Sequence, residues 1–213
     1  MVSECVKSGF EIDRIFVSEN YSGQAPLAEK TVFVSDDVFK TLSDEKSPQG
    51  ILCRAKIPSL PLVAPKGKAL FLDGVADPGN VGAIIRTANA AGYSEIYLTK
   101  ECADPYSPKS VRASMSGVFF TKLYQGERSD ILESLKDTPI LVADMDGENV
   151  FTFNAPGRFA LVIGNEANGV SDEVFARTTH TVKIPMSETQ ESLNAAVSAG
   201  IIMYVLQKDK YSK

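Results

Sequence analysis

The stretch IPMSETQESLNAAVSAGIIMYVL (184–206) joins the end of a strand, a polar turn and an almost wholly apolar helix, predicted from about Ser192 to Lys208. Its apolar residues cover most of the helix surface, and one face carries Leu193, Ala196, Val197, Gly200, Ile201 and Tyr204. A helix that is apolar nearly all round is buried or lies in an interface. Ser192 suits the N-cap position, but that role leaves the neighbouring Asn194 unexplained.

From residue 68 onward, short apolar strands alternate with helices. ALFLD (69–73), EIYLT (95–99), PILVAD (139–144) and FALVIG (159–164) are predicted strands, and NVGAIIRTANAAG (80–92) is a predicted helix. VFFTKL (118–123) is also predicted to be extended. This alternation predicts an α/β fold with a mostly parallel sheet that is covered on both faces.

The first 57 residues predict a separate, small α/β domain. Strands are expected at 12–19, 31–35 and 50–57, with a helix at 36–44. PSLPLVAPKG (58–67) contains three prolines, which disfavour regular structure, so we interpret it as a linker. The predicted organisation is therefore 1–57, a linker at 58–67, and a main domain at 68–213.

Composition excludes several classes of protein and site. No run approaches the roughly 20 apolar residues that span a bilayer, and MVSECVKSGF lacks a basic region followed by an apolar one, so we expect a cytoplasmic protein. The three cysteines are far apart and predict neither a disulfide framework nor a metal pair. His180 is the single histidine, which excludes a multi-histidine zinc site, and we expect no metal.

The net charge of −5 argues against nonspecific binding to nucleic acid. One segment, residues 106–128, nevertheless contains four cations against the single acid Glu127, namely Lys109, Arg112, Lys122 and Arg128. The segment is either a local basic surface or an ordinary solvated rim, and charge alone does not decide between them.

Ligands in open α/β sheets bind outside the carboxyl ends of the strands, where this chain has two further polar loops. In LDGVADPGNVGAIIRTANAAG (72–92), Pro78 and Gly79 form a turn and Asn80 is placed to cap the helix. Arg86 lies off the apolar stripe of that helix. It is either a solvated surface arginine or a guanidinium that binds a phosphate in bidentate fashion.

The other loop lies in LVIGNEANGVSDEV (161–174). The spacing of Gly164 and Gly169 fits a P-loop, but Val170 and Ser171 replace the required Lys-Ser/Thr pair, and no GxGxxG occurs. Both common nucleotide-binding fingerprints are therefore missing. Glu166 either binds loop backbone or orients a group in a site.

DPGNVGAIIRTANAAG (77–92), GNEANGVS (164–171) and IPMSETQESLNAAVSAG (184–200), in this order, closely resemble the three motifs of the SpoU (TrmH-type) RNA 2′-O-methyltransferases of the SPOUT superfamily. KSVRASMSGVFF (109–120) resembles the segment between the first two motifs. The match covers about residues 69–208, and four segments in order make it specific.

The resemblance implies a SPOUT-type fold whose C-terminal part forms a deep trefoil knot, and a homodimer that pairs through the knot. It implies that S-adenosylmethionine binds in the knot loops, at Gly164, Asn165, Ile184, Met186 and Leu193. The polar turn before the last helix then faces this methyl donor and the partner subunit's RNA site. Residues 1–57 resemble the family's RNA substrate-binding domain but lack its usual start, which leaves a fragment or a naturally short form open.

The implied activity is methyl transfer to a ribose 2′-hydroxyl of RNA, and the RASM segment (112–115) favours ribosomal over transfer RNA. Arg86 is the leading catalytic residue, as a phosphate anchor rather than a base, because a guanidinium hardly loses its proton. Orienting roles are implied for Asn80, Glu166, Ser192 and Asn194. Two alternatives stay open: an RNA-binding protein of this fold without methyl transfer, and a different nucleotide-using α/β enzyme, which the missing fingerprints disfavour.

Overall fold

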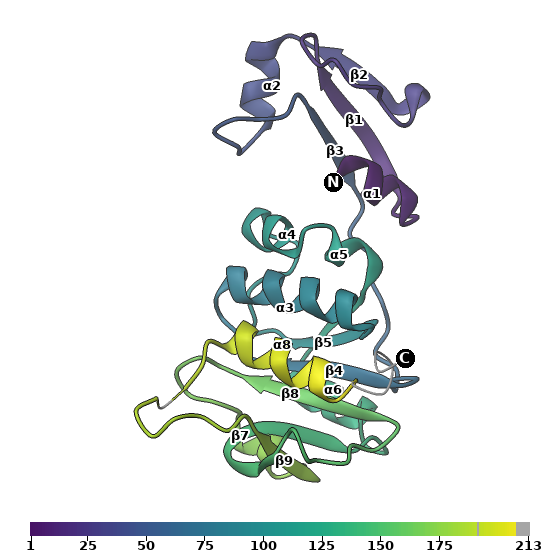
Figure 1. The fold of residues 1–213 in the computed structure, drawn as a ribbon. Helices are drawn as coiled ribbons and strands as arrows, with labels where there is room; N and C mark the ends of the chain where they lie inside the picture. Colours follow the sequence, from purple (N-terminus) through teal and green to yellow (C-terminus); the bar gives the residue numbers. More distant parts are fainter. Residues whose placement is uncertain (191, 208–213) are drawn as a thin grey trace. The chain divides into compact units, whose positions relative to one another are not determined.

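The computed structural model describes residues 1–190 and 192–207, and the chain forms two compact units, residues 1–58 and 59–213 (Figure 1). The first unit contains α1 (Val2–Lys7), β1 (Ile12–Ser18), η1 (Ala28–Lys30), β2 (Thr31–Val34), α2 (Asp36–Leu42) and β3 (Ile51–Ala55). Its sheet has the order β2-β1-β3, in which β2 is parallel and β3 antiparallel to β1. Apolar side chains from both helices and from β1 form its small core, namely Cys5, Ile12, Ile15, Val17 and Phe39.

The second unit is built on a six-stranded sheet with the order β6-β5-β4-β8-β7-β9, in which every pairing is parallel. The predicted mostly parallel sheet is therefore confirmed. The elements of this unit are β4 (Lys68–Asp73), α3 (Pro78–Ala91), β5 (Glu95–Thr99), α4 (Pro108–Ser114), α5 (Gly117–Phe120), β6 (Lys122–Gly126), α6 (Arg128–Ser134), β7 (Ile140–Asn149), β8 (Phe159–Gly164), α7 (Asp172–Phe175), β9 (His180–Lys183) and α8 (Ala195–Val205).

Both faces of this sheet are buried, which explains why its strands are continuously apolar. Because successive side chains of a strand point to opposite faces, Leu70 and Leu72 join the core beneath α3 and α8, whereas Ala69 and Phe71 join the core beneath α6 and α7. Figure 1 shows α3 and α8 packed together on one face of the sheet.

Two glycines allow α4 and α5 to pack closely on α3. A Cβ added at Gly82 would lie 2.4 Å from the carbonyl oxygen of Ser110, and one at Gly117 would lie 3.1 Å from the Cα of Arg86. The residues 118–120 belong to α5, so the prediction of an extended VFFTKL was wrong at its start. Strand β6 begins only at Lys122.

Helix α8 has one buried and one exposed apolar face. Ala199, Ile202 and Met203 are buried against α3 and the sheet, whereas Val197 is 50% and Tyr204 is 45% exposed. The face that contains Val197 and Tyr204 is the one that the sequence marks as an apolar stripe. An apolar helix that packs with only one of its faces is typical of an interface.

The ends of α8 differ from the prediction. The N-cap is Asn194 rather than Ser192, and the predicted end at Lys208 lies outside the described residues. At the other end of the helix, the Nζ of Lys68 donates to the carbonyl oxygen of Leu206 at 2.5 Å. A cation at the C-terminus of a helix interacts favourably with its unpaired carbonyl groups.

Most of the segment predicted as a linker packs on the second unit. Leu60 and Leu62 contact the core beneath α6, and the hydroxyl of Tyr97 donates to the carbonyl oxygen of Val63 at 2.7 Å. Within the described residues, no helix has the length and apolar character to cross a membrane. The cytoplasmic location stays a prediction.

The close approach at Gly82 generates a stability prediction. Gly82→Ala places a Cβ against the backbone of α4, and we expect it to lower the free energy of unfolding by about 1–3 kcal/mol, as overpacking does. Gly157→Ala is the control, since it is exposed and a Cβ there would meet nothing within 4 Å. We expect it to change the free energy of unfolding by no more than about 0.5 kcal/mol, as surface substitutions away from packed features do.

Urea unfolding at a fixed protein concentration measures both changes. A Gly82→Ala variant as stable as the parent would contradict the packing that the structure describes.

Candidate active site

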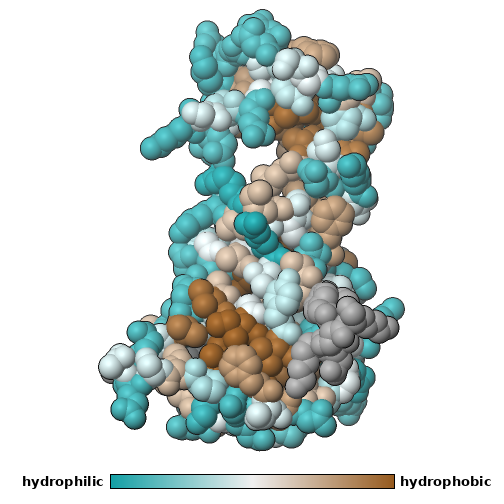
Figure 2. Space-filling view, viewed as in Figure 1, coloured by the Kyte–Doolittle hydropathy of each residue, from teal (hydrophilic) through white to brown (hydrophobic). Residues whose placement is uncertain are grey.

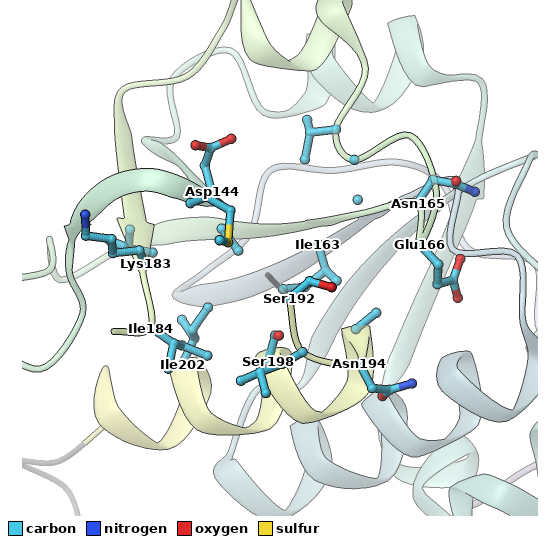
Figure 3. Close-up of a pocket in the computed structure, with 18 of the residues that line it drawn as sticks. Asp144, Ile163, Asn165, Glu166, Lys183, Ile184, Ser192, Asn194, Ser198 and Ile202 are labelled. Atoms are coloured by element: carbon cyan, nitrogen blue, oxygen red, sulfur yellow. The ribbon is translucent and has the colours of Figure 1, made fainter. Parts of the chain in front are cut away.

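A cavity of about 490 Å³ opens where the middle of β7 and the carboxyl ends of β8 and β9 meet the start of α8 (Figure 3). Asn165 and Glu166 lie on one side of it, Asp144 and Lys183 on the other, and Ser198 and Ile202 project from α8. Eight of the ten residues predicted for the site line this cavity: Gly164, Asn165, Glu166, Ile184, Met186, Ser192, Leu193 and Asn194. The cavity thus unites backbone from segments that are far apart in the sequence.

The loop after β8 closes on itself. The backbone N–H of Asn165 donates to the carbonyl oxygen of Gly169 at 2.8 Å. In return, the N–H of Gly169 donates to the carbonyl oxygen of Asn165 at 2.9 Å. Gly169 adopts a positive φ of 70°, which favours glycine. A Cβ added at Gly164 would lie 2.3 Å from the carbonyl carbon of Gly169. The compact turn therefore requires glycine at both ends.

Two further contacts attach this loop to the end of β4 and the segment after it, and an ion pair supports one of them. The side-chain amide of Asn165 donates to the carbonyl oxygen of Gly74 at 2.8 Å. The buried carboxylate of Asp73 accepts the backbone N–H of Ser171 at 2.8 Å and the Nε–H of Arg128 at 2.7 Å. Arg128 compensates the buried charge of Asp73, and Asp73 in turn binds the loop after β8 through Ser171.

Glu166 makes the central contact between these loops. Its carboxylate accepts the backbone N–H groups of Ala76 at 3.1 Å and Asp77 at 3.4 Å, and the side-chain amide of Asn80 at 2.8 Å. Partial burial by itself raises the pKa of the Glu166 carboxyl, but the hydrogen bonds from Asn80 and the backbone outweigh it and lower the pKa below its ordinary value. Glu166 is therefore a loop-binding anion.

The sequence predicts that Asn80 caps α3, and this prediction was wrong. Asp77 takes the N-cap position, and its carboxylate accepts the backbone N–H of Asn80 at 2.9 Å. The hydrogen bond from the Nζ of Lys109, at 2.8 Å, and then the backbone N–H of Asn80 lower the pKa of the Asp77 carboxyl below its ordinary value. The amide of Asn80 is therefore available to bridge Glu166 and the third loop.

Asn194 completes the bridge. Its amide Nδ2 donates to the Oδ1 of Asn80 at 3.0 Å, while its own Oδ1 accepts the N–H groups of Ala196 and Val197 at 2.9 and 3.3 Å. One side chain thus caps α8 and binds the first loop. This dual contact explains the second polar residue at the start of α8, which an N-cap at Ser192 left unexplained.

Arg86 lies apart from this network. It is exposed on α3 and, among the described residues, is not part of the cavity lining. It follows Asn80 by six positions, which places it about 9 Å further along the helix and about 120° around it. The structure therefore does not bring Arg86 to the cavity of its own chain.

Sequence reasoning missed one side of the cavity. Asp144 ends the run that the sequence predicts as a strand (139–144), and Met145 follows it. Both lie within β7, where its pairing with β9 is interrupted between Ala143 and Glu148, and Lys183 ends β9. The rule that ligands bind at the carboxyl ends of parallel strands applies to these two strands as well, and it was the signal that pointed to them.

Much of the cationic segment 106–128 is engaged in ion pairs. Lys109 binds Asp77, Lys122 lies 3.8 Å from Glu95, and Arg128 binds Asp73. Lys109, Lys122 and Arg128 therefore do not form a continuous basic surface.

Comparison with known proteins adds independent findings. Residues 67–204 match the model of the SpoU rRNA Methylase family. The chain is 29% identical over 212 residues to the 23S rRNA (guanosine(2553)-2′-O)-methyltransferase RlmP of Bacillus subtilis, covering 97% of this chain and 85% of that protein.

Two solved structures are similar over nearly the whole chain. The AdoMet-bound rRNA methyltransferase from Sinorhizobium meliloti has a TM-score of 0.87 and 26% identity, covering 98% of this chain and 84% of that one. The SpoU methyltransferase AviRb from Streptomyces viridochromogenes in complex with the cofactor AdoMet has a TM-score of 0.87 and 25% identity, covering 100% of this chain and 88% of that one.

The lowered pKa of Glu166 generates a pH prediction. The stability that its carboxylate contributes is fully present above the ordinary glutamate pKa of 4.5 and is lost as the pH falls through the lowered pKa. Glu166→Gln lacks this contribution at every pH. We therefore expect the variant to be less stable than the parent near neutral pH, and the difference to shrink below pH 4.5.

Urea unfolding of both proteins across this range measures the difference. A gap between parent and variant that is unchanged in acid would show that the carboxylate is not held by these donors.

Proposed function

The chain belongs to the SpoU rRNA Methylase family, and from that membership we propose that it methylates ribosomal RNA, with S-adenosylmethionine as methyl donor and a ribose 2′-hydroxyl as acceptor. The observation that carries the proposal is the single cavity that the loops after β8 and β9 form with the start of α8, hydrogen-bonded to the loop after β4. The preference for ribosomal RNA is supported by the relative named as a 23S rRNA enzyme, which matches both units of the chain.

The cavity suits S-adenosylmethionine in size and chemistry. Its volume of about 490 Å³ lies within the range of about 300–1,000 Å³ that is usual for small-ligand sites. Ile184, Leu193 and Ile202 offer apolar surface to a base, while Asp144 and Lys183 offer charges of both signs to the ammonium and carboxylate of the methionine part. When bound, the cofactor supplies a methyl group on a sulfonium, which is already a good leaving group.

The chain's own residues then have to position the RNA and stabilise the charge that grows on the 2′-oxygen. A guanidinium hardly ever loses its proton in a protein, so we assign Arg86 to hold a phosphate of the target nucleotide. That phosphate accepts the proton of the 2′-hydroxyl. Glu166, Asn80 and Asn194 keep the loops in place, and Ser192 faces the cavity to orient the ribose.

The separation of Arg86 from the cavity of its own chain supports a homodimer in which Arg86 serves the partner's cavity. A surface for such pairing is available on α8, where Val197 and Tyr204 are exposed. Figure 2 shows a hydrophobic patch on the face where α8 lies in Figure 1. The oligomeric state of the full chain under assay conditions tests this proposal, and an active monomer would contradict it.

We also propose that the segment after β9 forms the trefoil knot. The chain reaches the edge of the sheet at β9 and then returns to pack α8 on β8 and α3, a path that suits threading. Stretching a single chain by its ends measures this, because a knotted chain stops short of its full length.

Residues 1–58 are proposed to bind the RNA substrate, and their deletion is expected to weaken RNA binding while leaving cofactor binding intact.

The role of Arg86 generates a catalytic prediction. Arg86→Ala removes the phosphate anchor and leaves the residues that line the cavity unchanged, so we expect it to lower the rate of methyl transfer by about 100-fold or more, the scale of losing one key electrostatic contact. Affinity for S-adenosylmethionine, measured by calorimetry, is expected to remain. Arg177→Ala, at an exposed arginine after α7, is the matched control with the parent's rate.

A map of ribose methylation in total RNA from cells without the gene tests the activity in its setting. We expect a ribosomal ribose to lose its methyl group and to regain it with the parent gene but not with Arg86→Ala. Loss in transfer RNA instead would reassign the substrate. An unchanged map, together with a parent that binds RNA but no cofactor, would favour the RNA-binding alternative.

A further inference from the structure

The turn between α4 and α5 has an unusual backbone. Met115 has φ 47° and ψ 47°, and Ser116 has φ 80° and ψ −10°. They are the only non-glycine residues with positive φ in the described part of the chain. This left-handed conformation is unfavourable for any residue with a Cβ, and glycine is the usual residue at the end of a helix that adopts it. Such strain persists where the surroundings enforce it, and it clusters at functional sites.

The surroundings of this turn enforce its position next to Arg86. Gly117 is buried, and its Cα packs so closely that an added Cβ would lie 3.1 Å from the Cα of Arg86 and 3.2 Å from the carbonyl oxygen of Ile85. On the other side, Ser114 is buried and its hydroxyl donates to the carbonyl of Val111 at 2.8 Å. The turn is therefore fixed to the helix that carries Arg86.

The side chain that this turn presents is apolar and exposed. Met115 is 58% exposed although it lies between the buried residues Ser114 and Gly117. Ser114 and Gly117 fix the strained backbone of this turn, and that backbone does not require a methionine at position 115. The exposed Met115 side chain is also not held by burial in an apolar core. The geometry is that of a rigid turn that displays one flexible, apolar side chain, two residues before the glycine that packs on the backbone of Arg86.

We propose that Met115 is a wedge that packs against the base of the target nucleotide, or of its neighbour, while Arg86 holds the phosphate. This inference rests on the proposed function and deepens it. A 2′-hydroxyl in stacked RNA is poorly accessible, and proteins reach such groups by splaying bases and packing side chains against them. Methionine is among the apolar residues that proteins insert between base steps, and its thioether adapts to irregular surfaces.

The charges nearby favour RNA over a second protein subunit as the partner of Met115. Two exposed arginines belong to the elements next to the turn: Arg112 lies three residues before Met115 on α4, and Arg86 lies on α3 where Gly117 packs against it. Arginine and methionine also occur in protein interfaces, but cations beside an apolar tip suit phosphates beside a base. The apolar surface proposed for pairing with a second subunit lies instead on α8.

Met115→Ala tests the wedge in the full-length protein, with ribosomal RNA from cells that lack the gene as substrate. We expect kcat/KM for RNA to fall about tenfold, as losing one contact with a base does, while affinity for S-adenosylmethionine, Tm and oligomeric state stay at the parent's values. Met115→Leu keeps an apolar side chain of similar size and is expected to retain most of the activity.

Two variants distinguish an effect of the Met115 side chain from an effect of the strained backbone and from the loss of any exposed apolar side chain. Ser116→Gly relieves the strain and keeps Met115, so we expect it to raise the Tm and leave kcat/KM within about twofold of the parent's, since glycine adopts the same turn freely. Phe175→Ala removes a side chain that is 46% exposed on α7, a helix that covers the opposite face of the sheet from α3 and α8. This variant is expected to behave as the parent does.

A Met115→Ala variant with kcat/KM for RNA within twofold of the parent's overturns the proposal. So does a loss of activity that comes with dissociation of a dimer or with weaker cofactor binding, because Met115 would then belong to the interface or the cavity. RNA affinity measured without cofactor separates this inference from the proposed function. If the parent binds RNA and transfers no methyl group, weaker RNA binding by Met115→Ala supports the wedge, and equal binding overturns it.

Discussion

The structure of the site depends on one constraint: the carboxylate of Glu166 must be satisfied by donors from another loop. It receives two backbone N–H groups from the segment after β4 and the amide of Asn80, and Asn80 in turn binds Asn194. Hydrogen bonds to an ionised acceptor are stronger than neutral ones. A single anion therefore links three turns that the sequence separates by up to 114 positions, and the cavity lies where they meet.

The parallel sheet makes this meeting geometrically simple. Strands β4 and β8 are neighbours, so the loops after them leave the same edge side by side, and β7 and β9 bring Asp144 and Lys183 to the far side of the cavity. Helix α8 then has to return across the sheet to close the site. Its small residues and its two apolar faces suit that course, because one face packs on α3 and the other stays available.

The sequence predicts the parts of the site better than their arrangement. Strand periodicity indicates the parallel sheet, and the resemblance of the strand-end loops to the SpoU motifs leads to eight of the residues that line the cavity. The caps were wrong at both helices, Asp77 for Asn80 and Asn194 for Ser192, because neighbouring polar residues have similar cap propensities and only tertiary contacts decide between them. The distance between Arg86 and the cavity likewise depends on how α3 lies relative to the third loop, which no local pattern encodes.

Binding of S-adenosylmethionine to the purified protein, measured by calorimetry, tests the central claim most directly. The claim predicts saturable binding by the parent and a loss of at least about tenfold in affinity for Gly164→Ala, whose Cβ would collide with Gly169. Gly157→Ala, where a Cβ meets nothing within 4 Å, is expected to bind as the parent does. A parent that does not bind the cofactor, or a Gly164→Ala variant that binds it equally well, would contradict a cofactor site built on these loops.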